Sequence, residues 1–249
     1  MINYLKSENY RLLRKKSLYL TTAICFILIT AAAFVLYYFN EADSHFPYGT
    51  SSFFYSNVLG MGVLIIIISF VYNATLTGKD ISLTKQAVSF GISQSSIFWS
   101  KLMLTLCYFM FVCIAGILLM IGLGEILFAK EPETTGNFLI ASFNMVPIVL
   151  SGFILIHTLK MLKISDIYNI IIIAFIYIFS GDLLYFVFRQ MNGWNEFYLF
   201  APSTQLNDNL MSFMHQSVQL DYHYWVTGIV ISVIALFIGA ATFTKQDIG

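Results

Sequence analysis

The sequence predicts an all-α membrane protein with six transmembrane helices and with both ends of the chain in the cytoplasm. Three observations support this prediction: the composition is highly apolar, the apolar residues form blocks of membrane-spanning length, and the basic residues collect on one side. Of the 249 residues, 58% are hydrophobic and 10% are charged, whereas soluble domains usually carry about 25% charged residues. The chain therefore has too little polar surface to cover a globule in water.

The apolar blocks cover residues 18–39, 58–76, 102–123, 139–159, 169–188 and 225–243. Each is close to the roughly 20 residues that a helix needs to cross a hydrocarbon core of about 30 Å. The first block follows a basic run and contains alanines at 31–33 that could suit a signal-peptide cleavage site. Because this block is longer than a usual signal-peptide core, we expect an uncleaved anchor. Residues 1–249 are then one transmembrane domain.

The distribution of Lys and Arg predicts the orientation. With the N-terminus inside, eleven basic residues lie in inside segments, and only Lys130 and Arg189 lie outside. This bias follows the positive-inside rule, so we expect a multi-pass protein of the bacterial cytoplasmic membrane. The net charge is zero, which gives no reason to expect a nucleic-acid partner.

No pattern in the sequence predicts a catalytic, cofactor or metal site. The four histidines are scattered and lack the H-E-x-x-H spacing of a zinc protease. The only Gly-Lys pair, Gly78 and Lys79, precedes Asp80 and lacks the upstream glycine of a phosphate-binding loop. ATP-driven work would therefore require a separate ATPase chain.

Polar residues inside the apolar blocks are few. Asp182 is the one acidic residue within a predicted span, which makes it a candidate intramembrane polar site and raises the alternative of a proton-coupled carrier. It also lies close enough to the outer interface to reach water or a neighbouring helix. His157, and Asn144 with Pro147, are expected to form interhelical hydrogen bonds and a kink.

The last predicted span carries small residues at spacings of four, three and four. They form one helix face on which another backbone can approach closely. This face suits packing within the bundle, which we favour, or a subunit interface. Its members are Gly228, Ser232, Ala235 and Gly239.

Two cytoplasmic segments have amphipathic character. Residues 1–17 alternate leucines with basic residues, as in an interfacial helix on the inner membrane surface, although a first span needs such cations for topology alone. In the loop at 77–101, Asp80 is a suitable N-cap, Gly91 a stop and Ser93 a cap for the third span. Between them, Leu83, Ala87 and Phe90 share a helix face. This face could bind a soluble partner or rest on lipid.

The loop sequence at 78–101, GKDISLTKQAVSFGISQSSIFWSK, resembles the first cytoplasmic loop of type-2 ABC exporter permeases. In that family an acidic residue precedes a short helix, and a Gly-Ile-Ser-like turn and a lysine at the start of the third span follow it. The chain's beginning, YRLLRKKS at 10–17, and its ending, FTKQDI at 243–248, are also similar to the family's. Two positions depart from the pattern: Ile81 and Gln94 stand where the family often has basic residues.

The resemblance implies a permease subunit without a catalytic site, paired with a second permease as a homo- or heterodimer. A cytoplasmic ABC ATPase would bind ATP and Mg and would dock on a coupling segment. The small permeases that the chain resembles belong to bacteriocin or lantibiotic immunity and to export of amphipathic, phenol-soluble-modulin-like peptides, which implies a cargo of this kind. The implied coupling segment comprises Asp80, Leu83, Thr84, Lys85, Ala87, Val88, Phe90 and Gly91.

The outer segment at 189–224 is rich in aromatic residues, including Trp194, Phe197 and Phe200. Such apolar content is unusual for a solvated loop. It favours re-entrant or interfacial helices that form an outer lid, or a small folded extracellular cap.

Overall fold

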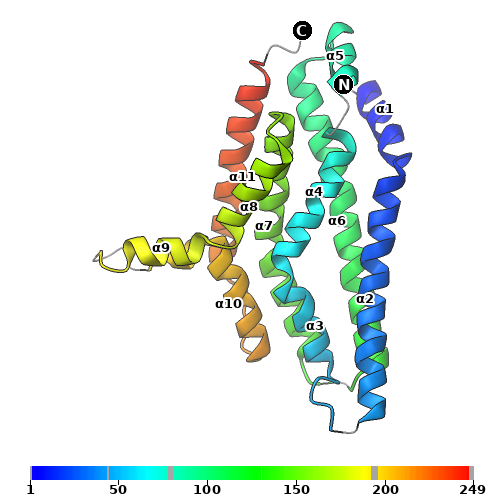
Figure 1. Cartoon of the computed structure of the whole chain (residues 1–249), viewed down its shortest axis with the longest axis vertical. Coiled ribbons are helices and arrows are strands. Elements are labelled where there is room, and N and C mark those ends of the chain that lie inside the picture. Colours follow the sequence, from blue (N-terminus) through cyan, green and yellow to red (C-terminus); the bar gives the residue numbers. More distant parts are fainter. Residues whose placement is uncertain (1, 44, 78–80, 130, 192–195, 247–249) are drawn as a thin grey trace.

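The computed structural model describes residues 2–43, 45–77, 81–129, 131–191 and 196–246. This part of the chain is helical throughout, and its one β-bridge joins Thr50 and Ala129. In chain order the helices are α1 (Ile2–Leu13), α2 (Lys16–Ala42), α3 (Ser51–Gly60), α4 (Gly62–Thr77), α5 (Ile81–Ser89), α6 (Gln94–Leu127), α7 (Thr134–Met161), α8 (Asp166–Tyr177), α9 (Ser180–Phe188), the 3-10 helix η1 (Phe197–Phe200), α10 (Pro202–Met214) and α11 (Tyr222–Phe243). Figure 1 shows the long helices side by side in one elongated bundle.

Four of the helices, α2, α6, α7 and α11, are long and apolar enough to cross a membrane alone. Two bent pairs, α3 with α4 and α8 with α9, raise the number of spans to six if each pair is one span. The prediction of a multi-pass, all-helical membrane protein is confirmed at this level. The sidedness stays a prediction.

The predicted spans 58–76 and 169–188 are not straight helices. The first is replaced by α3 and α4, which meet at 56° around Met61, and the second by α8 and α9, which meet at 54°. Glycine flanks Met61 on both sides, and glycine weakens a helix by about 1 kcal/mol relative to alanine. Hydropathy alone does not show such a bend, because the apolar character continues through it.

Helix α7 is the centre of the bundle. In its apolar stretch 67% of the residues are buried, compared with 11% in α2. Helices α4, α10 and α11 all pack against it. The chain therefore folds around α7, while α2 lies at the edge of the bundle (Figure 1).

The small-residue face of α11 lies against α7 of the same chain. A methyl group at Gly228 would lie 2.6 Å from the carbonyl carbon of Pro147, and one at Gly239 would lie 2.6 Å from the Thr158 side chain. Between them the Thr158 hydroxyl donates to the carbonyl oxygen of Ala235 at 3.2 Å. Ser232 is half-buried, and its hydroxyl donates to the carbonyl oxygen of Gly228 in the same helix at 2.7 Å. The face therefore serves the close approach of two helices within the bundle.

The outer segment contains η1 and α10, and α10 packs against α3 and α7. Buried amides fix it there: Asn209 donates to the carbonyl oxygen of Ala141 at 2.9 Å, and Gln205 donates to the Thr227 hydroxyl at 2.9 Å. Asn144 of α7 donates to the carbonyl oxygen of Gln219, in the connection before α11, at 2.8 Å. It also donates to Oδ1 of Asn209 of α10 at 3.5 Å, an interhelical bond of the kind that the sequence predicted for it. Helix α10 is thus part of the packed structure.

We expect Gly228→Ala to lower the free energy of unfolding by about 1–3 kcal/mol, because the added methyl collides with backbone that cannot rotate away. Thermal unfolding in detergent, followed by tryptophan fluorescence, measures the effect. Gly122→Ala in α6 is the matched control, since nothing lies within 4 Å of the added methyl. Equal melting temperatures for the two variants would contradict the tight α7–α11 contact.

Candidate functional site at the α5 end of the bundle

Helix α5 lies at one end of the bundle, beside the first turns of α6 and the end where α1 begins (Figure 1). We call this end the α5 end. Helix α5 stops in a Schellman motif, in which Gly91 has φ +80 and the amide of Ile92 donates to the carbonyl oxygen of Ala87 at 3.0 Å. Ser93 then caps α6 by accepting from the amide of Ser96 at 3.2 Å. These contacts confirm the predicted stop and cap, while Asp80 and Lys79 lie outside the described residues.

The two sides of α5 differ in exposure. Ala87 is buried against the bundle, and Thr84 and Val88 are half-buried. Leu83 is 40% exposed and Phe90 is 84% exposed. Phe90 follows the last residue of α5, but its amide still donates to the carbonyl oxygen of Gln86 at 3.0 Å, as in a helix. It comes seven residues after Leu83 and therefore lies on the side of Leu83, while Ala87 lies at the edge of the buried side. The exposed apolar residues of this segment are therefore Leu83 and Phe90, with Lys85 also exposed.

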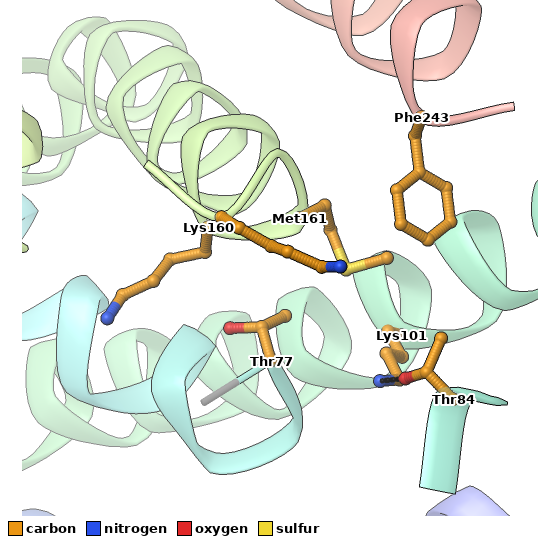
Figure 2. A pocket seen from close by; sticks show the side chains of 7 residues that line it. Thr77, Thr84, Lys101, Lys160, Met161 and Phe243 are labelled. Carbon is orange, nitrogen blue, oxygen red and sulfur yellow. Dashed lines mark hydrogen bonds between the residues drawn. The ribbon is translucent and has the colours of Figure 1, made fainter. Parts of the chain in front are cut away.

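Lys101 joins α6 to α5. Its side chain is buried, and its ammonium group donates to the Thr84 hydroxyl at 3.2 Å. Both side chains border a cavity of about 30 Å³ between the helix ends (Figure 2), which is room for about one or two water molecules. The lining residues come from α4, α5, α6, α7 with its following turn, and α11: Thr77, Thr84, Lys101, Lys160, Met161, Lys163 and Phe243.

Lys160, one of the lining residues, interacts with a carboxylate and an aromatic ring. Its ammonium group lies 2.6 Å from a carboxylate oxygen of Asp166 and 3.9 Å from the centre of the Phe70 ring. The carboxylate and the aromatic face hold this cation between α4, α7 and α8. The cavity is thus a small gap between the helix ends.

Next along the bundle from the cavity, Asn73 and His157 connect α4 to α7. The Nδ1 atom of His157 lies 3.1 Å from Oδ1 of Asn73, and both side chains are fully buried. The Asn73 amide also donates to the carbonyl oxygen of Phe153 at 3.3 Å, which assigns its oxygen as the acceptor and Nδ1 of the histidine as the donor. The His157 ring meets the Phe98 ring of α6 edge-on at 5.0 Å. The sequence predicted an interhelical bond for His157 but missed Asn73, whose signal is an amide inside an apolar block.

Helix α1 packs against α6 and the end of α4. Leu12 and Glu8 are buried, and the Glu8 carboxylate forms an ion pair with the Arg11 guanidinium at 2.9 Å. Arg11 also donates to the carbonyl oxygen of Leu76 at 3.5 Å. Burial, together with the neighbouring Glu8 carboxylate, raises the pKa of the Tyr4 phenol above its ordinary value. The amphipathic N-terminal helix therefore uses part of its apolar side to dock on the bundle.

The other candidate polar residue, Asp182, lies apart from this site. It is exposed in the first turn of α9 and does not face the bundle interior. Among the described residues, no group of His, Cys, Asp or Glu side chains could hold a metal ion.

Comparison of the chain with protein-family models, with curated proteins and with solved structures found no match. The description of the site consequently depends on its own geometry. That geometry is a surface helix with an exposed apolar patch and a hydrogen bond to α6. Helix α6 in turn contacts His157 of α7, which bonds to Asn73 of α4.

We expect Asn73→Ala and His157→Ala to be coupled in a double-mutant cycle, with an interaction free energy of about 0.5–1.7 kcal/mol, the range of hydrogen bonds between membrane helices. Thermal unfolding of the two single variants and the double variant gives the coupling. Asn57→Ala with His157→Ala is the control cycle, because Asn57 is exposed on α3 and bonds within its own helix. A coupling no larger than in the control would show that the contact contributes nothing to stability.

Proposed function

We propose that this protein is the membrane-spanning permease subunit of an ATP-driven ABC exporter that moves hydrophobic or amphipathic peptides out of the membrane or the cytoplasm. A separate cytoplasmic ATPase would bind ATP and Mg, and a second permease subunit would complete the membrane path. The observation that supports this function best is the exposed pair Leu83, in α5, and Phe90, just after it, beside the buried Ala87. An exposed apolar patch on a short helix with a defined C-terminal cap is a suitable surface for a soluble partner.

The contacts of α5 offer a route from such a partner into the membrane helices. A short turn through Gly91 and Ser93, and the bond from Lys101 to Thr84, tie α5 to α6. Helix α6 meets His157 of α7, and His157 bonds to Asn73 of α4. An ATPase whose contacts with α5 differ between its ATP-bound and ATP-free states would bias the arrangement of these helices. This chain then needs no covalent chemistry of its own.

The remaining parts of the proposal come from the resemblance of the sequence and from the charge distribution. Peptide cargo follows from the similarity to small immunity and modulin-export permeases, and the exposed apolar side chains along α2, α8 and α11 are compatible with lipid and with such cargo. The positive-inside bias places the α5 end in the bacterial cytoplasm. A proton-coupled carrier, the alternative, would depend on Asp182, whose side chain is exposed on α9.

We expect the tagged protein, purified from its native host in mild detergent, to bring down an ABC ATPase whose activity rises when both are reconstituted. Transport by such a complex should stop when ATP is withdrawn and should persist when an uncoupler collapses the proton gradient. Transport that follows the proton gradient, without an ATPase in the purified complex, would overturn the proposal in favour of the carrier.

The double variant Leu83→Asp/Phe90→Asp should lose stimulated ATPase activity by about tenfold or more, because two charges placed in an apolar contact cost several times the 1.4 kcal/mol that a tenfold change represents. Both side chains are exposed, so expression and melting temperature should stay close to those of the wild type. Tyr48→Asp, a charge at an aromatic residue 50% exposed between α2 and α3, controls for a general effect of added charge. Wild-type stimulation in the double variant would exclude this patch as the docking surface.

A further inference from the structure

Helix α9 leaves the bundle sideways, at about the middle of the length of the long helices (Figure 1). Its base is fixed, because the amide of Gly181 donates to the Ser203 hydroxyl at 2.7 Å and a side chain at Gly181 would collide with Thr204. Helix η1 folds back along it, with the rings of Phe188 and Phe197 5.5 Å apart. We call α9 and η1 together the arm. In this element α9 projects from the bundle, while η1 also packs against α10 and α11.

The two sides of α9 have different surroundings. Leu184 and Phe188 are half-buried on the side toward η1. Away from these two residues, positions spaced by three, one and three share a face. Tyr185 forms the edge of this face next to η1, where its ring meets the Tyr198 ring at 5.4 Å. The members of the face are Asp182, Tyr185, Phe186 and Arg189. All four are exposed, with Phe186 at 69%. We call this the arm face.

The arm face carries two charges in an apolar element. Asp182 makes no ion pair or side-chain hydrogen bond with any other described residue, and the Arg189 guanidinium lies 5.3 Å from the centre of the Phe186 ring of its own helix. If α6 and α7 cross the membrane, the arm leaves the bundle within the depth of the bilayer (Figure 1). Arg189, which the sequence predicted to lie outside, then lies at that depth. Charges at that depth are costly by several kcal/mol unless they are paired. The arm therefore needs a partner that neutralises a carboxylate and a guanidinium at once.

The charge pattern of the arm face is complementary to itself. The carboxylate lies in the first turn of α9 and the guanidinium just past its last turn, seven residues or about 10 Å apart along the helix. Two copies of α9 placed antiparallel about a two-fold axis would bring Asp182 of each copy opposite Arg189 of the other. The same axis would place Tyr185 opposite Phe186 at the centre. A two-fold contact of this kind satisfies all four charges with one repeated interaction.

We propose that the arm face is a subunit interface, in which α9 packs antiparallel against α9 of a second copy of this chain. The inference rests on the proposed dimeric permease and specifies it as a homodimer whose subunits meet through the arms. Lipid headgroups or a different permease chain are the other occupants that the experiment separates from this one.

The first measurement is disulfide cross-linking of the full-length protein in membranes, with Cys25, Cys107 and Cys113 changed to alanine. Phe186→Cys lies next to the two-fold axis, so mild oxidation should give a cross-linked dimer. Val187→Cys is the matched control, because it is also exposed, at 56%, but points about 100° around the helix and should stay monomeric. Equal cross-linking at the two positions, or none at either, would overturn the interface.

The second measurement exchanges the charges. Asp182→Arg alone and Arg189→Asp alone each place like charges opposite one another, so each variant should lose the cross-linked dimer at position 186. The double variant Asp182→Arg/Arg189→Asp should regain it. Co-expression of the two single variants with different tags should also give a mixed dimer, because each then carries the charges that the other requires.

Only pairing between chains predicts rescue in trans. Single variants that dimerise like the wild type would indicate that headgroups or water neutralise the charges, and capture of a different permease chain alone would indicate a heterodimer; either result overturns the inference. An ATPase that co-purifies and couples normally while the arms fail to cross-link would leave the proposed function standing. Arms that cross-link in a preparation without any ATPase would instead support the homodimer and contradict the proposed exporter function.

Discussion

The close approach of α11 to the backbone of α7 is the contact on which the rest of the bundle depends. Lipid chains are as apolar as leucine, so helices in a membrane gain little from burying apolar surface against one another. Association then relies on short distances and interhelical hydrogen bonds. The absence of a side chain at Gly228 lets α11 lie on the carbonyl of Pro147, and the bond from Thr158 to the carbonyl of Ala235 fixes the register about two turns further along α11.

Helix α7 also carries polar side chains that connect it to other elements. Backbone and side-chain polar groups inside a membrane find no water, so they are satisfied within the protein. Each of these residues reaches a different part of the chain: Asn144 reaches the connection before α11, Ser151 reaches Tyr177 of α8, His157 reaches Asn73 of α4, and Thr158 reaches α11. The bonds near the α5 end and the bonds near α10 thus share one rigid helix, which gives a displacement at one end a structural path to the other.

The sequence predicted local features of this fold better than its long-range contacts. The apolar blocks, Gly91 as the end of α5 and Ser93 as the cap of α6 depend on residues close together in the chain. The sideways course of α9 depends on the contact between Gly181 and Ser203, which lies more than twenty residues later in the chain. A hydropathy pattern does not reveal such a contact. The arrangement of the proposed coupling segment was only half predictable: helical spacing placed Leu83 and Phe90 on one side, but it did not show that Ala87, at the edge of that side, is buried. The assignment as a permease still depends on the resemblance of the loop.

The two bends in the bundle meet at α10. A side chain at Gly62, next to the α3–α4 bend, would press on Leu206, and Gly181, next to the α8–α9 bend, lies on Ser203 and Thr204. Both bends therefore pack against the first two turns of one short helix. Helices α4 and α8 lie on the α5 side of the bends, α3 lies on the other side, and α9 leaves sideways, while α2, α6 and α7 run unbroken past both (Figure 1). In the proposed exporter, a tilt of α4 that begins at the α5 end would displace Gly62. Gly62 would then push on Leu206 of α10, and α10 would shift the base of the arm. Broken helices are suited to this task, because their halves can change angle while the long neighbours keep the bundle together.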